Sequence, residues 1–137
     1  MFSLSAKGLY GMSAVLELAY RYEEGPVQIR DIAEARDIPR HYLEQILVAL
    51  KRGGIVKSYR GARGGYSLAS DPDSIKLLAV LSLLEGPLDV APGKRSDPRL
   101  NGLWNDLEEG ARHRLESSLA ELMEEIRQAD ARLNFTI

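Results

Sequence analysis

Five Lys and Arg side chains lie within thirteen residues of this chain, and no Asp or Glu lies among them: Lys51, Arg52, Lys57, Arg60 and Arg63. Such side chains bind phosphate groups through their charge, and the planar guanidinium of Arg adds paired N–H donors. A run of charges can also be no more than a solvated surface. The elements that carry these residues therefore decide whether the run predicts binding to a nucleic acid.

A helix is predicted over residues 39–52, where apolar side chains recur at the i, i+3, i+4, i+7 spacing: Leu43, Ile46, Leu47 and Leu50. Pro39 suits the start of a helix, and Gly53-Gly54 suits its end. The side opposite the apolar residues carries Val48 together with hydrogen-bond donors and acceptors: Arg40, His41, Glu44, Gln45, Lys51 and Arg52. This helix therefore presents one face to a core and one to a partner.

Two more helices are predicted before this one. Residues 5–22 carry an apolar stripe that we expect to face the core: Leu9, Met12, Val15, Leu16 and Ala19. Gly25-Pro26 ends that helix, because proline cannot continue it. A short second helix covers about 30–36, and a tight turn at Asp37-Ile38 separates it from the third. The order is that of a helix-turn-helix.

Strand-like residues follow the third helix. Residues 55–60 and 66–69 carry β-branched or aromatic side chains, and the glycine-rich segment 61–65 between them suits a hairpin tip. Asp71-Pro72 then resembles an N-cap and first-turn proline. We expect it to open a helix that runs to about Glu85, with these residues on one side: Ile75, Leu78, Ala79 and Ser82.

Three helices and a β-hairpin in this order predict a winged helix-turn-helix domain over residues 1–86, in a fold that is mainly α with a small hairpin. In this arrangement the helix over 39–52 fits the major groove of DNA, and the hairpin reaches a minor groove or the phosphates. The alternative is a winged-helix adaptor that binds a protein and no specific DNA. Basic residues on both the helix and the hairpin tip favour DNA binding.

The C-terminal part differs in charge and pattern. Residues 1–70 carry ten Lys and Arg and seven Asp and Glu, whereas residues 71–137 carry eight and thirteen. We expect a loop over 87–97 and, over 98–137, a dimerisation helix followed by a C-terminal helix. Ser118 to Glu121 fits a capping box, which favours two helices, although one continuous helix also fits the apolar spacing. The expected dimer contacts are Leu100, Leu103, Trp104, Leu107, Ala111 and Leu115.

Several classes of protein are disfavoured. There is no cysteine, and the two histidines, His41 and His113, are far apart in the chain, so neither disulfides nor a metal site is expected. No Ser/His/Asp set or carboxylate pair is placed by spacing, so we expect no enzyme. No apolar run is long enough to span a membrane, and no signal peptide is recognisable, which predicts a cytoplasmic protein.

Four short motifs carry a family resemblance: Leu4 to Tyr10, Tyr42-Leu43-Glu44-Gln45-Ile46, the Arg-Gly-x-x-Gly-Gly-Tyr stretch at 60–66, and Gly102-Leu103-Trp104. With them the chain resembles the Rrf (BadM-type) family of winged helix-turn-helix transcriptional regulators over nearly its whole length. The resemblance implies a regulator, expected to be a repressor, that binds an imperfect palindrome as a homodimer joined through the helix after the wing domain. It also leaves room for a small-molecule or protein effector.

The resemblance also assigns residues. His41, Tyr42, Glu44 and Gln45 match the groove-facing positions of the recognition helix, and Arg60 matches the arginine of the wing. Lys7 and Tyr10, in the first motif, complete the candidate DNA contacts. Members that bind an iron–sulfur cluster carry three cysteines in the loop corresponding to 87–101, and this chain has none; Asn101 stands at the position of their histidine ligand. We therefore expect no cofactor.

Overall fold

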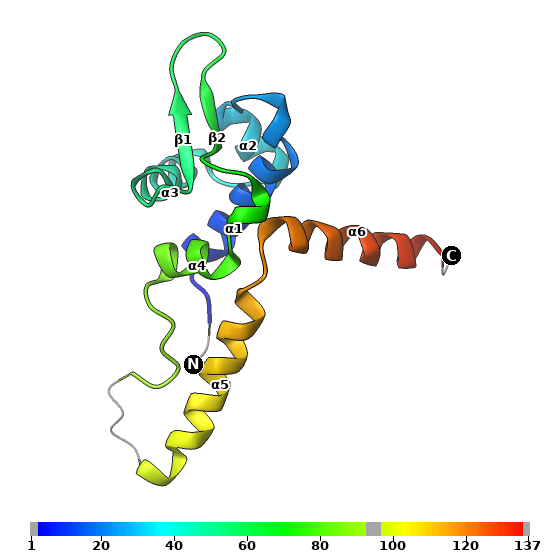
Figure 1. The fold of residues 1–137 in the computed structure, drawn as a ribbon. Coiled ribbons are helices and arrows are strands. Elements are labelled where there is room, and N and C mark those ends of the chain that lie inside the picture. The colour runs from blue at the N-terminus through cyan, green and yellow to red at the C-terminus, as the bar shows by residue number, and fades with distance from the viewer. Residues whose placement is uncertain (1–2, 93–96, 136–137) are drawn as a thin grey trace.

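The computed structural model describes residues 3–92 and 97–135 of the 137, without the side chains of 134 and 135. Its elements are the helices α1 (Ala6–Tyr20), α2 (Ile29–Arg36), α3 (Arg40–Arg52), α4 (Leu77–Glu85), α5 (Asn101–Leu115) and α6 (Leu119–Phe135), the strands β1 (Val56–Tyr59) and β2 (Gly65–Leu68), and the short 3-10 helices η1 (Tyr22–Glu24), η2 (Pro72–Ser74) and η3 (Pro98–Leu100). Figure 1 shows a body made of α1 to α4 and the hairpin, from which α5 and α6 extend in different directions.

The body is a winged helix-turn-helix, as predicted. β1 and β2 pair antiparallel, with Val56 opposite Leu68 and Tyr59 opposite Gly65. Val27, just before α2, pairs with Tyr66 of β2 through two backbone hydrogen bonds of 2.8 Å. The hairpin is therefore tied to the start of the helix-turn-helix as well as to the end of α3.

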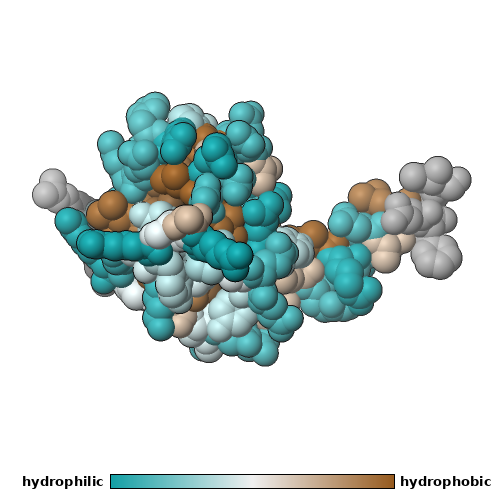
Figure 2. Space-filling model, turned by 90° about the horizontal axis from the view of Figure 1, so that it is seen from above, coloured by the Kyte–Doolittle hydropathy of each residue, from teal (hydrophilic) through white to brown (hydrophobic). Residues whose placement is uncertain are grey.

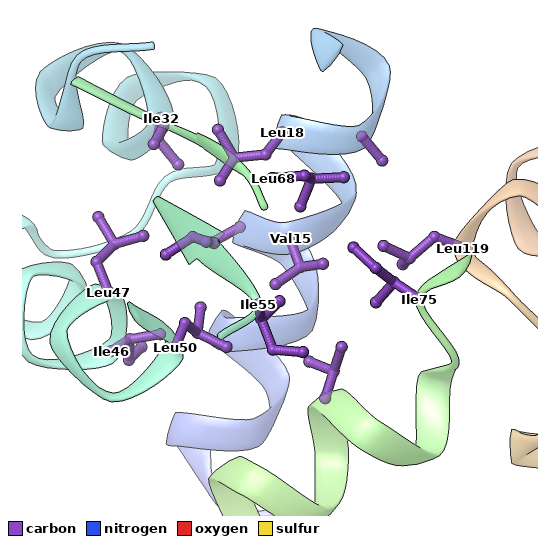
Figure 3. Packing of buried hydrophobic residues seen from close by; sticks show 14 of the residues in the cluster. Val15, Leu18, Ile32, Ile46, Leu47, Leu50, Ile55, Leu68, Ile75 and Leu119 are labelled. Atoms are coloured by element: carbon purple, nitrogen blue, oxygen red, sulfur yellow. The ribbon is translucent and has the colours of Figure 1, made fainter. Parts of the chain in front are cut away.

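One apolar core joins these elements. The side chains of Leu43, Ile46, Leu47 and Leu50 are fully buried, as the spacing in α3 predicts, and they pack with residues of α1, α2 and the hairpin (Figure 3). Leu119, the first residue of α6, is also fully buried and lies beside Ile75 in Figure 3. The start of α6 therefore belongs to the core of the body.

The predicted apolar stripe of the first helix is partly wrong. Leu9 is 58% exposed, and Leu16 is half-buried. Val15 and Ala19 of the predicted stripe are buried, and the rest of the apolar buried side is built from Gly8, Gly11, Ala14 and Leu18. Glycines allow α4 to approach closely, since a Cβ on Gly11 would lie 2.2 Å from Leu84 Cδ1. Hydropathy spacing could not show this, because glycine adds nothing to an apolar stripe.

The predicted helix from Asp71 to Glu85 is also wrong in its first half. Asp71 caps only η2, and Ile75 has extended backbone. Residues 75–77 pair instead with the segment between α5 and α6: Leu77 N–H donates to Ser117 O and Leu119 N–H to Ile75 O, each at 2.9 Å. Because α4 starts only at Leu77, its buried side is Leu77, Val80 and Leu84 rather than the predicted Leu78, Ala79 and Ser82.

The C-terminal part forms two separate helices, as favoured from the sequence. Ser118 Oγ accepts from Glu121 N–H at 3.1 Å, and Glu121 Oε1 accepts from Ser118 N–H at 3.2 Å. This capping box starts α6 after α5 has ended at Leu115. No residue of α5 is buried. Residues 87–92 of the expected loop contain no helix or strand, and residues 93–96 of it lie outside the described part.

Candidate nucleic-acid interface

The exposed face of α3 carries the polar side chains predicted for the recognition helix. Arg40, His41, Glu44, Gln45, Lys51 and Arg52 are all exposed, on the side opposite the buried leucines. Within the described residues, Glu44 and Gln45 form neither an ion pair nor a hydrogen bond with Arg40 or Arg52. Their donors and acceptors are therefore directed to solvent in this structure, where a base edge could meet them.

An apolar side chain lies among these polar ones. Val48 is 46% exposed and follows Glu44 and Gln45 by one helical turn. Apolar side chains on a recognition helix contact the C5-methyl group of thymine. Val48 therefore offers an apolar surface for such a contact on the exposed face of α3. The sequence pattern predicted this side for Val48 but gave it no role.

Tyr42 of α3 is half-buried and meets Tyr10 of α1. The two ring centroids are 5.6 Å apart, and the ring planes form an angle of 71°, an edge-to-face contact. Both residues were candidates for contacting DNA. In the structure each ring also forms part of the contact between α1 and α3.

The wing exposes three of the predicted basic residues. Lys57, Arg60 and Arg63 are exposed on β1 and at the hairpin tip. Gly61 has a φ of 102°, which side chains rarely adopt, and nothing lies within 4 Å of the place its Cβ would take. A phosphate backbone could therefore approach the tip at Gly61 closely.

The last two glycines of the wing motif have a structural role. A Cβ on Gly64 would lie 2.4 Å from Tyr59 O, and one on Gly65 would lie 2.4 Å from Val27 O. Gly65 also has a φ of 146°. The motif at 60–66 therefore combines an open, basic tip with a close backbone contact between the wing and Val27.

The first motif also has a structural explanation. Ser5 caps α1, and Glu85 at the end of α4 accepts hydrogen bonds from Ser5 N–H at 2.8 Å and from Ser5 Oγ at 2.7 Å. The carboxylate of Glu85 fills the space beside Gly8, where a Cβ would lie 2.1 Å from Oε1. Lys7, half-buried in the first turn, lies between these two positions. The motif therefore joins α1 to α4.

Sequence reasoning missed a buried carboxylate. Glu17 of α1 is only 7% exposed and binds two arginines: Arg36 Nε lies 2.7 Å from Oε1, and Arg21 Nε lies 2.8 Å from Oε2. Arg36 is the last residue of α2, directly before the turn that leads to α3. The cluster therefore holds the helix-turn-helix against α1. Only the unusual position of Glu17 on the inner side of the first helix could have indicated it.

The candidate dimer residues lie on α5 and η3. Leu100, Leu103 and Leu107 are exposed by 41%, 50% and 44%. Trp104 and Ala111 are half-buried, and Leu115 packs against the core of the body. The Nε1 atom of Trp104 is buried without a hydrogen-bond partner among the described residues. Figure 1 shows α5 extending from the body. The body leaves Leu100, Leu103 and Leu107 exposed in this segment.

The donor set of this chain does not fit an iron–sulfur cluster. Such clusters are held chiefly by cysteine thiolates, and the chain has no cysteine. The described residues contain no group of three or more His, Asp or Glu placed to hold a metal ion. Of the described helices, none is both long and apolar enough to cross a membrane.

Comparisons with known proteins agree with this geometry. The family model Rrf2, described as an iron-dependent transcriptional regulator, matches residues 4–126. The HTH-type transcriptional regulator CymR of Bacillus subtilis is 38% identical over 119 residues, which is 86% of each chain. The HTH-type regulator IscR of Aliivibrio salmonicida is 36% identical over 141 residues, covering 96% of this chain and 84% of that one.

A solved structure shows the same fold. The structure of CymR, the global cysteine regulator of B. subtilis, superposes with a TM-score of 0.82 at 37% identity, over 89% of this chain and 96% of that one. The recognition helix, the wing and the motifs that build them thus occur together in a chain that matches a family model over most of its length. This chain belongs to the Rrf2 family of DNA-binding transcriptional regulators.

Proposed function

We propose that this chain is a repressor that binds a palindromic operator as a homodimer. The observation that carries the proposal is the division of α3, whose apolar side is fully buried while its polar side is exposed beside a basic wing. A helix held in this way can present side chains to base edges without unfolding its core. Residues 1–86 would form the DNA-binding unit and residues 98–137 the dimerisation and C-terminal helices.

We assign two kinds of contact to this interface. Gln45 and Glu44 would read bases, with His41, Tyr42 and Arg40 beside them. Lys7, Tyr10, Lys51, Arg52, Lys57, Arg60 and Arg63 would contact the backbone or the grooves. Arginine at the wing tip suits a narrow, electronegative minor groove.

The dimer would form through α5. Burial of Leu103, Trp104 and Leu107 against the same residues of a second copy removes apolar surface from water, which is worth roughly 25 cal/mol per Å². A two-fold dimer places its two recognition helices about 34–36 Å apart, one turn of DNA, and so requires two symmetric half-sites.

No step of this mechanism passes through iron or any other cofactor, and we propose no catalytic activity. A repressor acts by occupying its operator. A small-molecule or protein effector would therefore act by changing the geometry of the dimer, which sets the spacing of the two recognition helices. The DNA partner places the protein in the compartment that holds the genome, which in bacteria is the cytoplasm.

A binding experiment separates this proposal from the winged-helix adaptor. Fluorescence anisotropy would compare a labelled duplex from the protein's own promoter region with an unrelated duplex of equal length at the same salt concentration. We expect tight binding of two chains to the promoter duplex and a large loss when one half-site is scrambled. Equal affinity for both duplexes would support the adaptor.

A further inference from the structure

A groove of about 780 Å³ lies on the body where α6 leaves it. The end of α1 and η1 form one wall, η2 contributes a second, and α6 lines the groove from Ala120 to Asp130. The proposed DNA interface uses none of these residues. Figure 1 shows α6 extending from the body on the side away from α3, with α1 between them.

The inside of the groove is largely apolar. Ala19 and Pro72 are buried beneath it, and Met123 and Ile126 of α6, which are partly buried, line its side. Tyr20 of α1, which is 45% exposed, stands at its edge. Figure 2 shows apolar surface at the base of the projecting α6. The groove could therefore cover the apolar side of another element.

The edge of the groove is strongly acidic: Glu23, Glu24, Asp71, Asp73 and Asp130. None of these carboxylates forms an ion pair with any residue that the structure describes. The groove also contains Arg127, but its guanidinium is bound to Glu124, with Nε 2.9 Å from Oε2. The negative charge at the edge is therefore not balanced by ion pairs within the described part of the chain.

We propose that this groove docks a cationic amphipathic helix of a partner protein. From Ala120 to Asp130 α6 rises about 15 Å, the length of roughly three turns of a helix laid beside it. Helices bind in such grooves through apolar side chains at i, i+3, i+4 and i+7. Lys or Arg on the flanks of the helix would meet the acidic edge, and opposite charges speed association and select the partner.

The charge of the groove argues against other occupants. DNA, RNA and anionic lipid would be repelled by the acidic edge. A second copy of this chain is a poor match, because its exposed apolar helix, α5, carries no excess of positive charge: Asp106, Glu108 and Glu109 outnumber Arg112 and Arg114. Since α1 separates the groove from α3, the partner would bind the regulator while the regulator is on its operator.

The test uses the full-length protein and a synthetic 14-residue helical peptide with Leu at i, i+3, i+4 and i+7 and Lys elsewhere. At low salt we expect binding by anisotropy, with NMR amide shifts concentrated at residues 19–24, 71–74 and 120–130. Ile126→Glu places a charge inside the groove and should weaken binding at least about tenfold. The double variant Glu23→Gln/Glu24→Gln should weaken it about threefold or more, as the loss of two surface ion pairs implies.

A matched variant controls for general attraction to acids. Asp106→Asn/Glu109→Gln removes two carboxylates from α5 and should leave peptide affinity within about twofold. Glu23→Gln/Glu24→Gln should leave operator binding unchanged, which separates this inference from the proposed function and shows that the variant is folded. The proposal is overturned if the peptide does not bind, or if the two double variants weaken peptide binding equally. It is also overturned if the NMR amide shifts spread over α5, or if a second copy of the chain fills the groove.

Discussion

Tyr10 of α1 and Tyr42 of α3 meet edge to face, with ring centroids 5.6 Å apart. The pair connects the first helix to the N-terminal turn of α3, the part of the helix that would enter the groove in the proposed complex. The orientation of α3 on the body therefore depends on an aromatic contact as well as on the buried leucines.

This contact should be measurable as a coupling energy. In a double-mutant cycle of Tyr10→Ala and Tyr42→Ala, followed by urea unfolding, we expect about 0.5–1.5 kcal/mol of coupling beyond the loss of buried area. Tyr20 lies on the same helix without an aromatic contact to Tyr42, so a cycle with Tyr20→Ala is the matched control. Equal coupling in both cycles would contradict the assignment.

Base readout by α3 makes a distinct prediction. Glutamine can pair with the N6 and N7 atoms of adenine, so Gln45→Ala should cost about 1–3 kcal/mol per half-site on the operator and leave non-specific binding nearly unchanged. Glu44→Ala should relax base preference and raise non-specific affinity, because it removes a negative charge from the interface. Binding to single-base operator variants at fixed salt tests both. If both mutants ranked the operator variants in the same order as the wild-type protein, the prediction of base readout by this face would be wrong.

The basic residues should act differently, since phosphate contacts carry no sequence information. Alanine at Lys51, Arg52, Lys57 or Arg63 should weaken binding to all duplexes alike. Each phosphate contact that is lost should make the slope of log K against log salt concentration shallower by about one. A dimer loses two such contacts, which doubles the change. Lys76→Ala is the control, because Lys76 lies away from the wing and is paired with Glu116. If the salt slope stayed unchanged in the four alanine variants, these four residues would not be phosphate contacts.

The dimer interface can be tested with two side chains of nearly equal exposure. Leu107 on α5 is 44% exposed, and Val48 on α3 is 46% exposed. Leu107→Glu should give monomers by light scattering, because it places a charge in an apolar interface, and Trp104→Glu should do the same. Val48→Glu should remain dimeric. If the Leu107→Glu protein remained dimeric, the dimer interface would have to lie outside this part of α5.

The ion pair between Lys76 and Glu116 should respond to pH. Lys76 Nζ lies 2.7 Å from Glu116 Oε2, and this hydrogen bond, aided by the charge of Lys76, lowers the pKa of Glu116 below its ordinary value. The same interaction raises the pKa of Lys76. The pair therefore stabilises the fold at pH values above the pKa of an unfolded-state Glu and below the pKa of an unfolded-state Lys. This stabilisation is lost as the pH falls through the lowered pKa of Glu116. It is also lost as the pH rises through the raised pKa of Lys76.

Carboxyl NMR titration of Glu116 gives the measurement. In Lys76→Met the pKa of Glu116 should rise towards its ordinary value, because the donor and its charge are gone. If the pKa did not move, the pair would not form in solution.

Local pattern was sufficient for much of this protein. The spacing of Leu43, Ile46, Leu47 and Leu50 predicted both the span of α3 and its buried side, because a helix held against one core repeats its apolar residues every turn. The glycines at 61–65 predicted the hairpin tip, and the capping box at Ser118 predicted the break before α6. Each of these features is encoded within a single helix or a single hairpin.

Tertiary structure decided what depends on contacts between distant segments. Ile75 is extended because its backbone pairs with residues 117–119, and Leu9 is exposed because the glycines of α1 pack on α4 instead. Glu17 is buried because Arg36, nineteen positions along the chain, neutralises it. The acidic groove likewise exists only because α6 returns to α1 and η2. Such contacts are selected by close packing and charge pairing in three dimensions, which leave no period in the sequence.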